Sequence, residues 1–139
     1  MRRYDLEANC ELVWCEFLSS LGQKILFGVY YRPPNTGVEY FQCLRDSLAT
    51  IDDKFDKIFL AGDFNLPGFD WINQVPLSSE PLYLDAYELL NDSFLTQVYF
   101  HPTRNNSILD LVLTTVPDLI SDIYSFQDIV DSDHNCVSF

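Results

Sequence analysis

Apolar residues recur along the chain with two different periods, which predict strands and helices in alternation. Segments 11–17 and 24–31 are rich in β-branched and aromatic residues, so we expect two strands joined by a turn at Gly22. Both faces of the first strand are largely apolar, which predicts that both are covered. Apolar residues three or four positions apart predict a helix over about 37–53. A wholly apolar strand at 57–62 follows, and the order strand, helix, strand predicts an α/β crossover.

The second half of the chain is less regular. A loop rich in proline occupies 63–81, and an apolar stripe then predicts a second helix over about 82–94. An apolar run predicts a strand at 107–115, and two more short strands are expected at 121–127 and 134–139. A chain of 139 residues has room for one domain, so the pattern predicts a single domain with mixed α and β structure.

Charge and composition exclude some classes of function. The chain has 8 Lys and Arg against 21 Asp and Glu, a formal net charge of −13. This balance argues against a general binder of the phosphate backbone, and it suits a site where carboxylates surround a cation. The sequence shows neither a secretory signal nor an apolar run of the roughly 20 residues that a membrane helix needs. We therefore expect an intracellular protein, nuclear or cytoplasmic, without a membrane partner.

The sharpest local chemical signal is Asp63 together with Asn65, directly after the apolar strand. If the backbone stays extended, the two side chains project from the same face into one cleft. That cleft lies beyond the carboxyl end of a strand, which is where α/β sheets bind ligands. Turn formation is the alternative, because Asp and Asn close turns routinely.

Two more acidic residues and a histidine follow in the C-terminal half. Asp133 and His134 precede the last predicted strand, and one of them can hold a cation while the other donates to a phosphoryl oxygen. A solvated turn is the alternative. Asp110 interrupts an apolar strand, and a buried carboxylate there needs a partner, for which His134 is a candidate. An outward-facing Asp on an edge strand is equally compatible with the sequence.

Four residues are weaker candidates for contacts with a phosphate or a nucleic acid. Tyr31 can offer its phenol to a phosphate, and Trp71 can stack on a base. Thr103 and Arg104 can touch a phosphate backbone. Each aromatic residue can instead simply pack, and Thr103 can instead cap a turn.

Five strings of the sequence carry a family resemblance. They are YRPPN at 31–35, GDFNLPGFDW at 62–71, PTR at 102–104, LDLVLT at 109–114 and SDH at 132–134. In this order, over nearly the whole chain, they resemble the endonuclease/exonuclease/phosphatase family, and most closely the apurinic-type endonuclease domain of non-LTR retrotransposons. The resemblance implies a DNase I-like fold, an α/β architecture in which a two-sheet β-sandwich is flanked by helices. It also implies hydrolysis of a phosphodiester in DNA with Mg²⁺, or with Mn²⁺ in its place.

The resemblance also implies roles for individual residues. Asp63 would orient or deprotonate the attacking water, and His134, oriented by Asp110, would stabilise the transition-state charge. Carried over by position, the full set is Tyr31, Asp63, Asn65, Asp110 and His134 for catalysis, Asp133 for the metal, and Thr103, Arg104 and Trp71 for substrate binding. Hard oxygen ligands and charge neutralisation are what Mg²⁺ and phosphoryl transfer require.

The sequence departs from this family at its start. Family members begin with two strands that carry an Asn and a metal-binding Glu, and nothing here corresponds to them. We therefore expect a partial domain, its C-terminal half to two-thirds, with impaired nicking of DNA and with a reverse transcriptase domain as partner in a longer protein. A non-catalytic relic or binding module on the same scaffold is the alternative. A phosphatase of lipid or inositol phosphates is a third.

Overall fold

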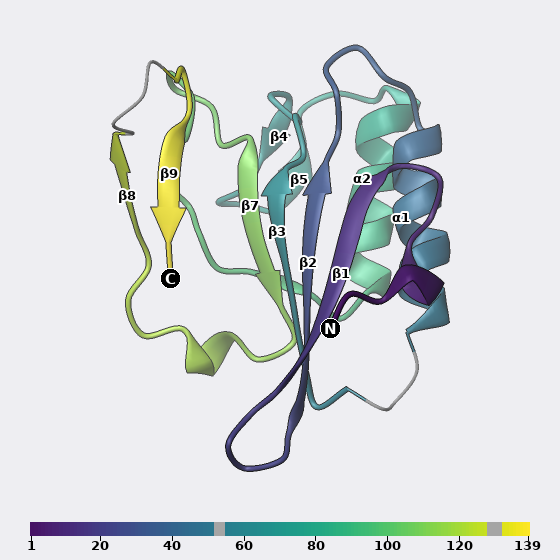
Figure 1. The fold of residues 1–139 in the computed structure, drawn as a ribbon. Coiled ribbons are helices and arrows are strands. Elements are labelled where there is room, and N and C mark those ends of the chain that lie inside the picture. Colours follow the sequence, from purple (N-terminus) through teal and green to yellow (C-terminus); the bar gives the residue numbers. More distant parts are fainter. Residues whose placement is uncertain (52–54, 128–131) are drawn as a thin grey trace.

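The chain folds around one central sheet, which the computed structural model shows together with two helices and a C-terminal hairpin (Figure 1). Residues 1–51, 55–127 and 132–139 are described. The elements are η1 (Tyr4–Leu6), β1 (Glu11–Leu18), β2 (Lys24–Tyr31), α1 (Glu39–Thr50), β3 (Lys57–Asp63), β4 (Phe69–Asp70), β5 (Val75–Pro76), α2 (Pro81–Asp92), β6 (Thr96–Gln97), β7 (Asp110–Thr114), η2 (Pro117–Leu119), β8 (Tyr124–Gln127) and β9 (Asn135–Ser138).

The central sheet has the strand order β1-β2-β3-β7-β6. Strands β1 and β2 form an antiparallel hairpin, while β2 and β3 are parallel and are joined through α1. The predicted α/β crossover is therefore confirmed. Strand β7 then pairs antiparallel with β3, and the short β6 pairs with β7 at the edge. As a result, the C-terminal ends of β2 and β3 and the N-terminal end of β7 meet at the same end of the sheet, which we call the sheet edge.

Different structures cover the two faces of this sheet. Helices α1 and α2 cover one face, and the antiparallel hairpin β8–β9 lies on the other side, next to β7 (Figure 1). The ring of Phe139, just after β9, stacks on Phe27 of β2 and Phe59 of β3, with centroid distances of 6.1 and 6.5 Å. The predicted architecture of two sheets with flanking helices is thereby confirmed.

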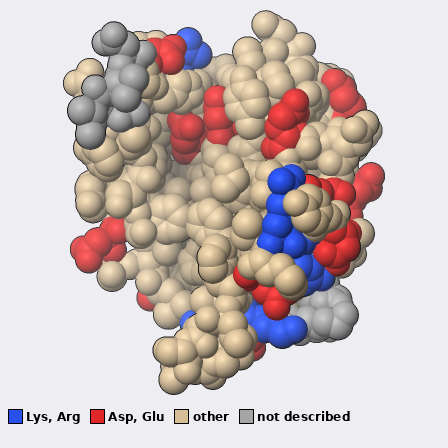
Figure 2. All heavy atoms as spheres, in the orientation of Figure 1, with Lys and Arg blue, Asp and Glu red and all other residues tan. Residues whose placement is uncertain are grey.

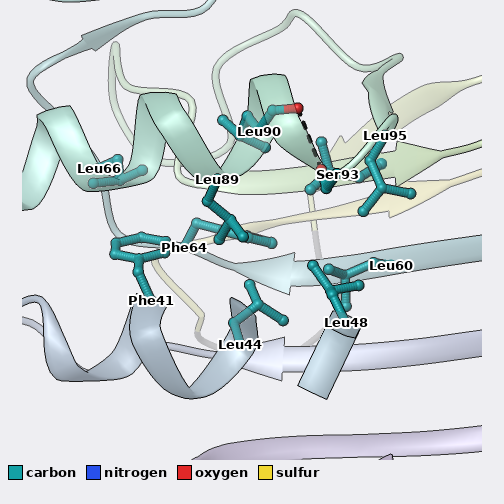
Figure 3. Close-up of a pocket in the computed structure, with 11 residues that line it drawn as sticks. Phe41, Leu44, Leu48, Leu60, Phe64, Leu66, Leu89, Leu90, Ser93 and Leu95 are labelled. Atoms are coloured by element: carbon teal, nitrogen blue, oxygen red, sulfur yellow. Dashed lines mark hydrogen bonds between the residues drawn. The ribbon is translucent and has the colours of Figure 1, made fainter. Parts of the chain in front are cut away.

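The main core fills the space between the sheet and the helices. Leu44 and Leu48 of α1, Leu89 of α2 and Leu60 of β3 point toward one another there (Figure 3). The space left between them is a cavity of only about 10 Å³, which is at the lower limit for a single water molecule. This region is a packed interior that holds the sheet to the helices, and it has no room for a ligand.

Three sequence expectations need correction or restriction. The outer face of β1 is not covered as predicted, because Phe17 there is 54% exposed. The strand predicted from residue 107 begins only at Asp110, because Ser107 pairs instead with Arg104 in a turn. Helix α1 ends at Thr50, and the predicted helical positions 52 and 53 lie outside the described residues. None of the helices formed by the described residues is long and apolar enough to cross a membrane.

Gly62 lets β3 approach β2 closely just before Asp63. Its φ is +147°, and a Cβ placed there would lie 1.8 Å from the carbonyl oxygen of Tyr30. We expect Gly62→Ala to lower the free energy of unfolding by roughly 2–5 kcal/mol, because it adds both a clash and backbone strain. Urea unfolding measures the loss. Gly22→Ala is the matched control, since Gly22 also has positive φ (+78°) but nothing within 4 Å, and it is expected to cost about 1 kcal/mol. Equal losses in the two variants would contradict the expectation.

Candidate functional site

Three of the candidate residues lie side by side across the sheet. In the strand register Tyr31 of β2 is the partner of Asp63 of β3, and Asp63 is the partner of Asp110 of β7. Residues paired in register project from the same face of a sheet. That face is the one on which the hairpin β8–β9 lies, whereas α1 and α2 cover the other. Two carboxylates and a phenol therefore form one row at the sheet edge.

His134 joins this row from the opposite layer. It precedes β9, and its ring Nδ1 lies 2.8 Å from Oδ2 of Asp110. A carboxylate acceptor at this distance selects the tautomer with a proton on Nδ1, which leaves Nε2 as the ring atom for a substrate. Both side chains are about three-quarters buried. The His134–Asp110 partnership suggested by the charge inside an apolar strand is thus present, and an outward-facing Asp110 is excluded.

Asp63, Asp110 and His134 form a group that can hold a metal ion. One ligand atom from each of the three lies within 4.8 Å of the others, and all three residues are half-buried. The remaining carboxylate oxygens are hard donors of the kind that divalent cations prefer. Among the described residues, no other group of three or more His, Cys, Asp or Glu side chains gathers in this way.

The electrostatics of Asp63 agree with such a role. Burial raises the pKa of its carboxyl above the usual value, and the charge of Asp110 raises the pKa further. His134, the backbone N–H of Asn65 and Arg32 oppose the increase without cancelling it. Two carboxylates in one half-buried row therefore carry unfavourable negative charge, which a bound cation would neutralise.

Asn65 reaches the site through a turn and not through an extended strand. Its φ is +53°, and its backbone N–H donates to Oδ1 of Asp63 at 2.9 Å. Its side-chain Nδ2 donates to the carbonyl of Arg32 at 3.4 Å. The extended geometry expected from the sequence is wrong, because the chain turns at this residue. The turn chemistry that was the alternative is present, and it still keeps the carboxamide beside the sheet edge.

Thr103 is buried and does not lie where a substrate can reach it. Its side chain is 1% exposed, and Oγ1 accepts the backbone N–H groups of Leu109 and Asp110, each at 3.2 Å. Its carbonyl accepts the N–H of Asn135, next to His134, at 2.7 Å. The predicted phosphate contact is therefore replaced by the alternative, a capping role. Through it Thr103 ties together the two segments that carry Asp110 and His134.

Asp133 and Arg104 pair with each other. A guanidinium nitrogen of Arg104 lies 2.6 Å from Oδ2 of Asp133; Asp133 is exposed and Arg104 is partly buried. Asp133 was predicted to bind the metal, but it does not belong to the group formed by Asp63, Asp110 and His134. Neighbouring residues point in opposite directions near a strand, so His134 turns inward while Asp133 faces the solvent.

Trp71 lies in the interior, which contradicts its predicted role in base stacking. Its side chain is 3% exposed, its ring stacks on that of Phe69 at 4.3 Å, and Nε1 donates to the carbonyl of Ile108. No face of the indole is left for a base. The alternative, an aromatic residue that seals the loop region of its own domain, is what the structure shows.

Arg32 is a residue of this region that the sequence interpretation treated only as the end of a strand. It is 3% exposed, and its guanidinium donates to the carbonyls of Phe64 and Asn65. The sequence offers a weak signal for it, namely a cation at the end of an apolar strand and beside two prolines.

The fold and the site define a class of protein. The structure resembles the solved endonuclease domain of TRAS1, a telomere-specific non-LTR retrotransposon, with a TM-score of 0.76 and 19% sequence identity. The likeness covers 99% of this chain and 64% of that chain, and it shows a DNase I-like fold. The family of endonuclease-reverse transcriptase proteins matches residues 25–138, and the chain belongs to this family. None of the curated proteins compared with the chain matches it.

Proposed function

We propose that this domain hydrolyses phosphodiester bonds and nicks DNA as the endonuclease part of a retrotransposon-type protein. The observation that carries the proposal is the pair formed by His134 and Asp110 at 2.8 Å, with Asp63 in the same group. An acid–base histidine held by a carboxylate, next to a second carboxylate, is the arrangement that attack of water on a phosphate requires. The family of the chain supports the same activity.

Each residue of the row has a chemical task in this proposal. Asp63 accepts a proton from the attacking water, as a carboxylate beside the substrate phosphate can. As the doubly protonated imidazolium, His134 donates from Nε2 to a phosphoryl oxygen, while the hydrogen bond from Nδ1 to Asp110 fixes the orientation of the ring. Tyr31, the register partner of Asp63, and Asn65, whose backbone N–H donates to Asp63, hold the phosphate in line with the water.

The donor set fits a divalent cation, for which we propose Mg²⁺. Asp63 and Asp110 would hold it through carboxylate oxygens, since Mg²⁺ takes one or two carboxylates and keeps several waters. When bound, the cation supplies positive charge against the charge that develops on the phosphate. Mn²⁺, which also accepts carboxylate ligands, is expected to replace it.

The proposed partners are DNA and a reverse transcriptase domain in a longer protein. The net charge of −13 leaves little attraction for a phosphate backbone. On the face shown in Figure 2, the basic side chains gather mainly near the N-terminal strand, away from the site. Arg104 is already paired with Asp133, the neighbour of His134 in the sequence. We therefore propose that the 139-residue chain binds DNA weakly and turns over slowly, and that neighbouring segments supply basic surface.

The test is nicking of supercoiled plasmid by the purified chain at high enzyme excess. We expect open circles to form with millimolar Mg²⁺ or Mn²⁺ and not with EDTA, and we expect the metal to raise the thermal unfolding midpoint. An N-terminally extended chain is expected to nick faster. Absence of both nicking and a thermal shift would support the alternative, a non-catalytic scaffold. Hydrolysis of inositol phosphates without nicking would support a phosphatase.

A further inference from the structure

The guanidinium of Arg32 is buried without a carboxylate partner. The residue is 3% exposed, and none of the ion pairs among the described parts of the chain involves it. Burial lowers the pKa of this arginine, which shows that its surroundings disfavour the charge. Removing an arginine from water costs stability unless its donors are satisfied. The hydrogen bonds of this side chain must therefore compensate for its burial, and an apolar residue could not make them.

The donors of Arg32 join two loops that leave neighbouring strands. Its Nε donates to the carbonyl of Phe64 at 2.9 Å, and Nη2 donates to the carbonyl of Asn65. Its Nη1 donates to the carbonyl and to Oγ1 of Thr36, at 3.0 and 2.9 Å. Thr36 in turn donates to the carbonyl of Pro33 at 2.8 Å. One planar group thus holds the loop after β2 to the loop after β3.

The backbone of Arg32 completes this connection. Its N–H donates to the carbonyl of Asp63 at 2.9 Å, and its own carbonyl accepts the side-chain Nδ2 of Asn65. Asn65 is therefore held at its carbonyl by the guanidinium and at its carboxamide by the carbonyl of the same residue. Its left-handed φ of +53° is uncommon for a residue other than glycine and persists only where surrounding contacts fix it.

We propose that Arg32 is a positioning residue for the site, which holds Asn65 in its left-handed turn and thereby keeps its backbone N–H on Asp63 and orients its carboxamide for the substrate phosphate. This inference rests on the proposed function. Arg32 touches no reacting atom in this role, and it acts through Asn65. Lysine cannot replace it, because a single ammonium lacks the planar fork that spans two loops.

The first test is Arg32→Lys. We expect kcat for nicking to fall by about 10- to 100-fold, since small misplacement of a positioned group costs up to about that much. KM is expected to change by less than about twofold, because the charge and the phosphate contacts elsewhere remain. Arg45→Lys is the matched control. Arg45 also donates to a backbone carbonyl, that of Asp85, but it ties α1 to α2, and its replacement should leave kcat unchanged.

A double-mutant cycle separates positioning from general stability. Asn65→Gly removes the carboxamide and tolerates positive φ. If Arg32 acts through Asn65, then Arg32→Lys lowers kcat in the parent chain but has little further effect in Asn65→Gly. Additive losses would overturn the proposal. Should Arg32→Lys fail to fold, Thr36→Val, which removes one acceptor of the guanidinium, is put through the same cycle with a smaller loss expected.

A measurement that does not depend on turnover distinguishes failure of the proposed function from failure of the proposed role of Arg32. The N–H of Asn65 donates to Asp63, so its hydrogen exchange reports the turn directly. In Arg32→Lys this amide is expected to exchange about tenfold faster or more, while amides paired within β1 and β2 keep their protection. If the parent chain does not nick DNA, the proposed function has failed, and this exchange rate alone judges the role of Arg32. Unchanged exchange at Asn65 would reject that role even in an active enzyme.

Discussion

Replacement of Asp63 by asparagine is expected to stabilise the protein at neutral pH while it removes nearly all nicking. The pKa of this carboxyl is raised in the folded state, chiefly by burial and then by Asp110, so its ionised form is less favourable when the chain is folded. Asn65 can still donate to the new side-chain oxygen. Loss of a general base costs roughly 10²- to 10⁴-fold in rate. We therefore expect activity and stability to change in opposite directions.

The pH dependence gives this expectation a definite sign. A group with a raised pKa in the folded state contributes stability that is fully present below its unfolded pKa and is lost as the pH rises through its folded pKa. Asp63→Asn mimics the protonated form at every pH. Its thermal midpoint should therefore exceed that of the parent at pH 7, and the difference should shrink toward zero in acid.

Asp70→Asn is the control of opposite sign. Hydrogen bonds from the side chain of Asn73, and then from backbone N–H groups, lower the pKa of Asp70, which is partly exposed. Its ionised form therefore supports the fold at neutral pH, and that support is lost as the pH falls through its folded pKa. Asp70→Asn should lower the midpoint slightly at pH 7 and leave nicking intact. A lower midpoint for Asp63→Asn at pH 7 would mean that burial does not disfavour the ionised carboxylate of Asp63.

Replacement of His134 by alanine is expected to lower nicking by roughly 10²- to 10⁴-fold, the usual contribution of a general acid or base. Asp110→Asn should cause a loss of similar size, because the carboxylate selects the proton position on the ring. The two residues act as one unit, so the double variant should be little worse than either single variant. Single-turnover rates of plasmid nicking measure all three.

His101→Ala is the matched control for this pair. His101 is the other histidine of the chain; it is exposed, and its ring lies edge-on to Tyr99 at 5.7 Å, outside the group that can hold a metal. It is expected to nick at the parent rate. Losses at His134 and Asp110 that multiply would mean that the two side chains act independently, in conflict with their contact at 2.8 Å.

Much of the fold could be predicted from periodicity alone. The strands around Gly28 and Leu60 and the helix between them lie where the apolar pattern predicts them. Strands β4, β5 and β6 have two residues each, which is too short to show any period. The close approach of Gly62 to Tyr30 and the turn at Asn65, which Arg32 holds, depend on residues 32 or more positions away, and local sequence cannot show such contacts.

A site residue could be predicted from the sequence where burying its charge would be energetically unfavourable without a partner. It could not be predicted where its role depends only on whether the side chain points inward or toward the solvent. Asp110 stands out because a charge inside an apolar strand needs a partner, and the structure supplies His134. Trp71 and Thr103 carry polar atoms that serve a ligand and a backbone group equally well. Their burial comes from packing against residues around Ile108 and Leu109, so only the folded chain distinguishes the two uses.

The two halves of the proposed acid–base unit come from different layers, Asp110 from the central sheet and His134 from the C-terminal hairpin. The proposed activity therefore requires that this hairpin pack against the central sheet, and the stacking of Phe139 on that sheet favours such packing. Local opening of one small peripheral unit would separate imidazole from carboxylate while the helices and the larger sheet persist. On heating, the proposed nicking activity should accordingly be lost at a lower temperature than the one at which the helices and the larger sheet unfold.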